Sequence, residues 1–312
     1  MKHRTFIIGN GFDLDLGLHT SYQDFVSSDL WPITDSDIER SSLAKKLEKD
    51  KKENWFNLED ALCEYAQARP AQSELNVMKI GTYSFDMDVY RRIKEALLAF
   101  IRNHQRIQPN KDSMAADVLR HISSYGVFDN ILSFNYTDID SICEKVGSNK
   151  VNYKHVHGAC SDGKIILGVA DGYELKEGYD VLYKTSDTNY KSANVQNSLH
   201  DVDEVVFYGH SLGSQDYHYF DYFFKHNSRE GMTTDDLVNI TFFTKNVDSA
   251  AELKRQLRKM IPEGFGRLMD SNHVTFIHTQ DKSSSDLADF YNRFSAIQKQ
   301  IIRQRVRGVT VQ

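Results

Sequence analysis

The stretch FIIGNGFD (residues 6–13) carries the strongest fold signal in this chain. Its apolar first half is typical of a buried strand, and two glycines and an aspartate follow at once. Glycine permits close approach of a ligand, and the end of a first strand is where parallel α/β sheets bind nucleotide phosphates. The stretch therefore predicts a nucleotide site, with a plain strand-to-helix turn as the alternative. It is not the full dinucleotide fingerprint, because Leu14 stands where a third glycine is expected.

Length and composition are those of an ordinary globular protein. The chain has 312 residues, of which 40% are hydrophobic and 26% charged. Its net charge of −6 argues against strong general binding to nucleic acid or to anionic membranes. Cys63, Cys143 and Cys160 are far apart, so we expect no metal site, no disulfide framework and a reducing cytoplasm. No apolar run is long enough for a signal peptide or a membrane span.

Strands and helices are expected to alternate along most of the chain. Apolar runs predict strands at 4–9, 127–134, 151–156, 164–169, 204–208, 238–244 and 273–278. Helical periodicity and capping residues predict helices at 21–28, 36–52, 55–68, 86–105, 112–125, 138–146, 216–226, 248–260 and 284–304. This alternation favours one Rossmann-like α/β domain over residues 1–312, with a mostly parallel sheet covered by helices on both faces. Residues 36–125 have no strand signal and are expected to form an inserted helical subdomain.

Four predicted strands end in glycine or small polar residues, which suits ligand binding beyond the carboxyl ends of a parallel sheet. These endings contribute Gly9, Asn10, Gly11 and Asp13; Asn135 and Thr137; His157 and Gly158; and Gly209, Ser211 and Gly213. Each ending alone is also compatible with a capped turn. Their joint occurrence is what indicates a site.

His157 is the strongest candidate for acid–base chemistry, because histidine titrates near neutral pH. His155 would face the same side of a regular strand, but a turn at Gly158 would place His157 nearer the edge of the sheet. The alternative is a packed or hydrogen-bonded histidine. Asn135 offers both a donor and an acceptor, which suits a carboxamide or a ribose hydroxyl, although it also precedes a helix and would fit a cap.

The motif Gly209-His210-Ser211-Leu212-Gly213 fits the nucleophile elbow of α/β hydrolases as well. A triad of Ser211, Asp248 and either His273 or His278 would follow the permitted order. Against this reading, the motif lies late in the chain and no His-Gly-Gly-Gly oxyanion segment precedes it. A serine hydrolase would also have no need of the glycine loop at 9–13. It remains the alternative enzyme.

Five segments occur in an order that is typical of a known family: IIGNGFDLDLGLHTSYQDF (7–25), NWFNLED (54–60), SFNYTD (133–138), HVHG (155–158) and GHSLG (209–213). Together they resemble the bacteriophage abortive-infection family AbiH, which implies a bacterial role in phage defence. Trp55 and Glu59 lie one helical turn apart in the second segment. Trp55 is expected in the core, and Glu59 is a secondary candidate for a catalytic carboxylate.

The same residues resemble the sirtuin-like (SIR2) fold more distantly. That resemblance implies NAD as ligand or substrate, with no further cofactor. It implies a nucleotide-binding set consisting of Gly9, Asn10, Gly11, Phe12, Thr137, Gly209 and Ser211. Zinc-binding cysteine pairs are missing, so protein deacylation is not implied. The chain looks closer to defence proteins with SIR2-like domains, and that resemblance implies hydrolysis of NAD.

The implied mechanism gives three residues a catalytic role. Asn135 would orient the nicotinamide ribose, His157 would take a proton, and Asp13 would stabilise positive charge on the sugar. The non-enzymatic alternative is a nucleotide-binding toxin or sensor. The resemblance implies control by a partner, namely an antitoxin, a regulatory protein or a phage trigger protein, and leaves room for a homo-oligomer. Residues 171–200 are the expected lid.

Overall fold

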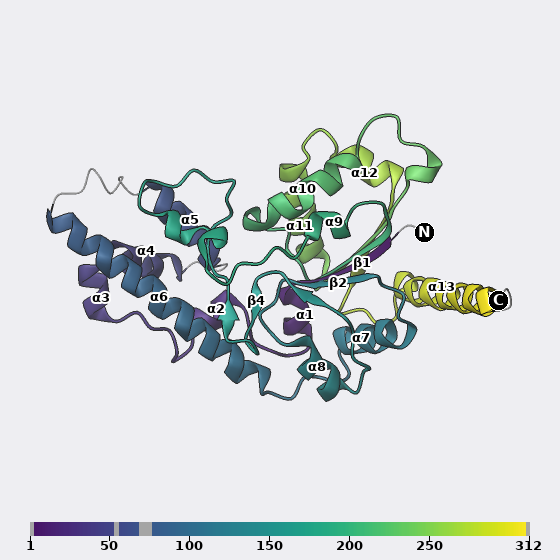
Figure 1. Ribbon diagram of the computed structural model, residues 1–312, viewed down its shortest axis with the longest axis horizontal. Helices are drawn as coiled ribbons and strands as arrows, with labels where there is room; N and C mark the ends of the chain where they lie inside the picture. The colour runs from purple at the N-terminus through teal and green to yellow at the C-terminus, as the bar shows by residue number, and fades with distance from the viewer. Residues whose placement is uncertain (1–2, 53–55, 69–76, 310–312) are drawn as a thin grey trace.

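A six-stranded parallel sheet forms the framework of the computed structural model, which describes residues 3–52, 56–68 and 77–309 (Figure 1). Its strands are β1 (His3–Ile8), β2 (Asn130–Ser133), β3 (Lys154–His155), β6 (Val202–Tyr208), β7 (Asn239–Thr244) and β8 (His273–His278). Their spatial order is β3-β2-β1-β6-β7-β8, and every pair is parallel. This is the doubly wound order, which reverses between β1 and β6. The predicted Rossmann-like α/β class is therefore confirmed.

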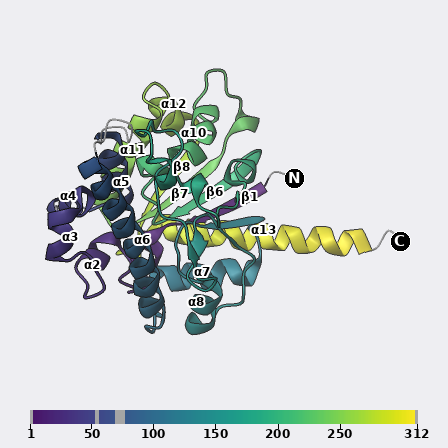
Figure 2. The same cartoon turned by 60° about the vertical axis from the view of Figure 1, so that its left-hand side comes forward.

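Helices cover both faces of the sheet because successive strand residues point to opposite sides. Ile7 packs into one hydrophobic cluster, whereas Phe6 and Ile8 pack into another. The cluster around Phe6 includes side chains of α1 (Asn10–Asp15), α7 (Met114–Tyr125), α8 (Ile139–Val146) and α13 (Ser285–Val309). The cluster around Ile7 includes side chains of α9 (Val195–Ser198), α10 (Tyr217–His226), α11 (Val247–Met260) and α12 (Phe265–Ser271). Figure 2 shows α13 extending outward from the sheet.

A third hydrophobic cluster forms beside the sheet, in what we call the helical unit. It is built on α2 (Tyr22–Val26), α4 (Ser42–Asp50), α5 (Leu58–Ala68) and α6 (Val77–Gln105), and α3 (Asp35–Arg40) lies against α4 and α6 without contributing a buried side chain. The boundaries of this helical unit differ from the insertion expected at residues 36–125. Phe25 and Leu182 pack into this cluster, while α7 packs against the sheet because its apolar face meets β1. Trp55 lies outside the described residues.

Several elements are shorter or more divided than their sequence patterns predict. Ser41 ends α3 and begins α4, because its hydroxyl accepts a hydrogen bond from Ala44 N and donates to Asp86. The predicted strand at 164–169 contributes only β5 (Lys164–Ile165), which pairs with β4 (Gly158–Ala159) in a separate antiparallel hairpin. Residues 171–200 contain the 3₁₀ turns η2 (Asp180–Leu182) and η3 (Lys184–Ser186) before α9. None of the described helices combines the length and apolarity that a membrane span requires.

Candidate active site

The loop after β1 and the loop after β6 pack backbone against backbone at the point where the strand order reverses. Gly9 N donates to Tyr208 O, and Gly11 N donates to Gly209 O, both at 2.9 Å. A Cβ on Gly11 would lie 2.6 Å from the Cα of Gly209, so only glycine fits there. Gly209 also has a φ of +64°. The glycines are thus explained by packing, and the N–H groups of Gly9 and Gly11 are not available to a pyrophosphate in this conformation.

Asp13 is the centre of a buried polar network that joins the β1 loop to the β2 loop. Its carboxylate accepts hydrogen bonds from Asn135 Nδ2 at 2.8 Å, from Thr137 Oγ1 at 2.9 Å and from Thr20 Oγ1 at 3.1 Å. Thr20 Oγ1 also lies 2.8 Å from Asn10 Oδ1. The structure therefore brings together four of the residues that the sequence singled out, namely Asn10, Asp13, Asn135 and Thr137.

The environment of Asp13 suits a positioning role better than direct contact with substrate. The residue is 1% exposed, and its two carboxylate oxygens already lie within hydrogen-bond distance of three donors, Asn135, Thr137 and Thr20. Burial raises the pKa of Asp13 to about 6, although the hydrogen bonds from Thr137, Asn135 and Thr20 oppose this. Phe12, next to it, is fully buried in the sheet core and contacts Tyr208. That side chain therefore packs in the core and is not free to contact a nucleotide.

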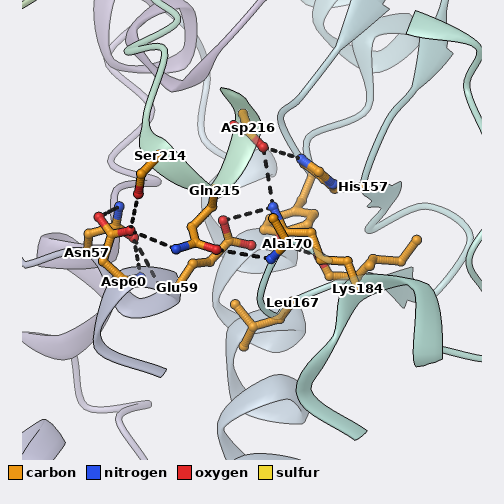
Figure 3. Close-up of polar contacts among 12 residues, drawn as sticks. Asn57, Glu59, Asp60, His157, Leu167, Ala170, Lys184, Ser214, Gln215 and Asp216 are labelled. Carbon is orange, nitrogen blue, oxygen red and sulfur yellow. Dashed lines mark hydrogen bonds and ion pairs between the residues drawn. The ribbon is translucent and has the colours of Figure 1, made fainter. Parts of the chain in front are cut away.

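A second cluster contains the predicted base, His157, and three charged side chains (Figure 3). His157 Nε2 lies 3.3 Å from Asp216 Oδ1, and Lys184 Nζ lies 3.3 Å from the same oxygen. Lys184 Nζ also pairs with Glu59 Oε2 at 3.0 Å. The other oxygen of Asp216 lies 3.6 Å from His210 Nε2. Glu59, the secondary candidate, thus reaches the site from helix α5 of the helical unit.

His157 is held in its neutral form, which leaves one ring nitrogen without a hydrogen. Burial, reinforced by the nearby ammonium of Lys184, lowers the pKa of His157 to about 4, so its ring is neutral at physiological pH. We assign the ring hydrogen to Nε2, because the Asp216 carboxylate 3.3 Å away can only accept a hydrogen bond. The lone pair is then on Nδ1, which is buried and has no hydrogen-bond partner among the described residues. His155 lies elsewhere, with its Nδ1 atom 3.0 Å from Asn135 O.

The charges around His157 balance one another within the protein interior. Burial alone would lower the pKa of Lys184, but the Glu59 and Asp216 carboxylates raise it above its usual value. Burial would raise the pKa of Asp216, yet Lys184 and His157 hold it well below its usual range. Burial raises the pKa of Glu59 despite the opposing charge of Lys184. Glu59 Oε1 is also buried and lacks a partner in the described part of the chain.

The structure does not assemble the alternative serine triad. Ser211 is exposed and forms no hydrogen bond to a histidine within the described ranges. His273 begins β8, so it lies at the amino edge of the sheet, opposite the Gly209 loop. His278 is at the carboxyl edge but is bonded to Thr244 Oγ1 at 3.1 Å. In the Gly-His-Ser-Leu-Gly motif, the buried side chain that faces the charge cluster is His210.

Three members of the cluster were missed from the sequence: Lys184, Asp216 and His210. Asp216 follows the Gly209–Gly213 motif by only three residues, so the motif itself was an available signal. Lys184 lies in 171–200, where no periodicity marks it. Backbone hydrogen bonds of Val169 to Leu182 and Lys184 fix this segment against the loop at 167–170. The described residues contain no group of three or more His, Cys, Asp or Glu arranged to hold a metal ion.

The cluster lies where the helical unit meets the sheet. Asp60 Oδ1 accepts from Ser214 Oγ at 2.8 Å and from Gln215 Nε2 at 3.1 Å. Gln215 Oε1 in turn accepts from Ala170 N at 3.0 Å (Figure 3). Asn57 Nδ2, at the start of α5, donates to the other oxygen of Asp60 at 2.7 Å. These bonds hold α5, the 167–170 loop and η4 (Ser214–Asp216) together. Glu59, Lys184 and Asp216 can therefore meet only while this junction is closed.

Comparison with known proteins decides the family. The sequence model of the family described as "Bacteriophage abortive infection AbiH" matches residues 5–235. The chain belongs to the AbiH family. No curated protein matches it. The matched range includes both site clusters, from the β1 loop to Asp216, and membership gives the AbiH chain a role in abortive infection by bacteriophage.

Proposed function

We propose that this AbiH protein binds NAD where the strand order reverses between β1 and β6, in a crevice that forms when the junction with the helical unit opens, and hydrolyses its glycosidic bond to nicotinamide. The observation that carries the proposal is the buried His157–Asp216 pair, in which Nδ1 of a neutral imidazole has no partner. Reversal of the strand order between β1 and β6 supports it, since doubly wound sheets bind nucleotides at that point. Both site clusters flank this reversal.

The proposed step breaks the bond between C1 of the ribose and the nicotinamide nitrogen. The bonding electrons leave with nicotinamide, and the ribose becomes an oxocarbenium ion. A water molecule then attacks C1, and His157 Nδ1 accepts the proton that this water loses. Asp216 stabilises the resulting imidazolium, as the acidic member of a histidine–carboxylate pair does elsewhere.

Glu59 is better placed than Asp13 to stabilise the positive charge on the sugar. Its Oε1 atom is unpartnered, whereas both oxygens of Asp13 are occupied by hydrogen bonds. Asp13 then acts through its neighbours: it orients Asn135 and Thr137 at the edge of the crevice. In this proposal Asn135 still faces the nicotinamide ribose.

The closed junction explains why control by a partner suits this site. His157, Glu59 and Lys184 are all more than nine-tenths buried, so NAD gains access only when the segment at 167–186 or α5 moves. A regulatory protein, an antitoxin or a phage trigger protein would act by shifting this opening equilibrium. The lid expected at 171–200 is part of the same proposal.

The test is NAD consumption by purified protein, with chromatography of the products. We expect nicotinamide release by the wild type and a loss of about 10²-fold or more in His157→Ala, because a general base contributes that much. Ser211→Ala is the matched control from the competing mechanism and should keep kcat, since Ser211 is exposed and outside the cluster; the loss of its expected contact with the nucleotide would raise KM alone.

Other outcomes would change the assignment. NAD binding without consumption, unaffected by His157→Ala, would identify a sensor and contradict the catalytic proposal. Loss of activity in Ser211→Ala, with His157→Ala unimpaired, would favour the serine hydrolase instead.

A further inference from the structure

A pocket of about 510 Å³ lies on the surface near the C-terminal end of α6, and none of its lining residues belongs to the charge cluster around His157. Helix α8 and the β4–β5 hairpin complete its wall. Three lining residues are cationic, none is a carboxylate, and the set comprises Arg102, Gln105, Arg106, Ser141, Lys145, Cys160 and Ser161. The pocket therefore combines concentrated positive charge with hydroxyl and amide groups that can donate hydrogen bonds.

Two of the cations are held in place without being neutralised. Arg102 Nε donates to Cys160 O at 3.0 Å, which leaves both Nη groups of the guanidinium without a hydrogen-bond acceptor in the described structure. Lys145 Nζ donates to the backbone carbonyls of Gln105 and Ile107. Neither of these residues nor Arg106 forms an ion pair with any carboxylate in residues 3–52, 56–68 and 77–309. In a chain of net charge −6, three cations around one pocket that form no ion pair within the described residues favour an anionic ligand.

The cysteine in the pocket wall favours reversible binding over covalent chemistry. Cys160 is buried, and its thiol donates to Gln105 Oε1 at 2.6 Å. Burial raises the pKa of the Cys160 thiol to about 11, so the thiolate needed for nucleophilic attack is absent at neutral pH.

We propose that this pocket binds the phosphate group of a small phosphorylated molecule. Guanidinium groups match phosphate oxygens in geometry and charge, and a lysine adds a point charge. The volume is within the range of small-molecule sites. The acidic net charge argues against a long polyanion, which would meet repulsion beyond the pocket. The pocket shares no residue with the NAD site, so this inference stands independently of the proposed function.

The experiment is titration calorimetry with inorganic pyrophosphate at constant ionic strength. Arg106 is exposed and its side chain forms no hydrogen bond among the described residues, so Arg106→Glu should leave the fold intact. We expect this variant to bind pyrophosphate at least roughly tenfold more weakly, because one charged hydrogen bond is lost and a repulsive charge is added. Lys259→Glu is the control, since it makes the same charge change at an exposed position on α11.

Three results would overturn the proposal: no binding of pyrophosphate by the wild type up to about 10 mM, equal binding by Arg106→Glu and wild type, or equal weakening by Lys259→Glu. His157→Ala separates this pocket from the NAD crevice. Pyrophosphate binding that depends on His157 but not on Arg106 would place the anion in the crevice. The outcome of the pyrophosphate titration does not depend on NAD hydrolysis, so this proposal and the proposed function can fail separately.

Discussion

At the scale of single residues, Asp13 shows that burial and hydrogen bonding have opposite effects on the pKa of a carboxyl group. Its position after Gly9-Asn10-Gly11 predicted that it would lie at the same sheet edge as Asn135 and Thr137, and in the structure both of these side chains donate hydrogen bonds to it. Nothing in the sequence indicated that both carboxylate oxygens would accept hydrogen bonds within the protein. Thr20 adds to this network from the loop after α1.

Asp13 should make the protein less stable as the pH rises. Its pKa is raised from about 3.8 to about 6 by folding, so protonation favours the folded state and this contribution disappears as the pH rises through 6. Between pH 5 and pH 7 the loss is about 1 kcal/mol. Asp13→Asn cannot titrate, so the difference in unfolding free energy between wild type and variant should shift by that amount. Urea unfolding at both pH values measures it, and a constant difference would contradict the assigned pKa.

At the scale of elements, two glycines at equivalent positions in their helices make a matched comparison. Gly11 is the second residue of α1, and Gly266 is the second residue of α12. A Cβ at position 11 would meet the backbone of Gly209 at 2.6 Å, whereas a Cβ at position 266 would meet nothing within 4 Å. Gly11→Ala should therefore cost about 1–3 kcal/mol or more of stability. Gly266→Ala should be neutral or stabilising by up to about 1 kcal/mol. Thermal unfolding of the two variants checks this, and similar effects at both positions would rule out close packing as the cause.

The ion triad of Glu59, Lys184 and Asp216 links three elements, α5, η3 and η4. Lys184→Met leaves two carboxylates in the interior and should cost about 3–5 kcal/mol, because a buried charge without its partner is strongly unfavourable. Lys184→Met combined with Glu59→Gln should recover part of that loss. Both are measured by chemical denaturation.

Lys46 provides the control for this prediction. It also bridges two carboxylates, Asp50 and Glu64, but its side chain is 26% exposed, against 2% for Lys184. Lys46→Met should cost no more than about 1 kcal/mol. Equal costs at positions 46 and 184 would mean that the buried triad does not stabilise the junction.

At the scale of the whole molecule, sequence patterns predicted what depends on local chain chemistry. Buried strands and their glycine endings gave the parallel sheet and the residues at its carboxyl edge, because strand period and turn chemistry are local properties. The charge cluster was only partly foreseen. Glu59 and His157 were named, but Lys184 and Asp216 join them only after the helical unit packs on the sheet. Contacts between segments that are far apart in the sequence leave no periodic pattern in it.

The same junction should govern access to the site. Gln215 Oε1 accepts from Ala170 N, and Gln215 Nε2 donates to Asp60, so Gln215→Ala leaves a buried N–H without its partner. This loss, about 1–3 kcal/mol, should lower the free energy of opening the junction. Amide hydrogen exchange over 167–186 should become faster, at labelling times that leave β6 and β7 protected.

Asn272→Ala is the matched control for that exchange experiment. Asn272 is also a buried amide, and its Oδ1 accepts from Val238 N at 3.1 Å, away from the helical unit. Its replacement removes an equivalent hydrogen bond without touching the junction, so exchange over 167–186 should match that of the wild type. If Asn272→Ala accelerates this segment as much as Gln215→Ala does, general destabilisation explains the result. Acceleration confined to Gln215→Ala would mean that the segment at 167–186 opens as a separate step, which is the motion that the proposed access to His157 requires.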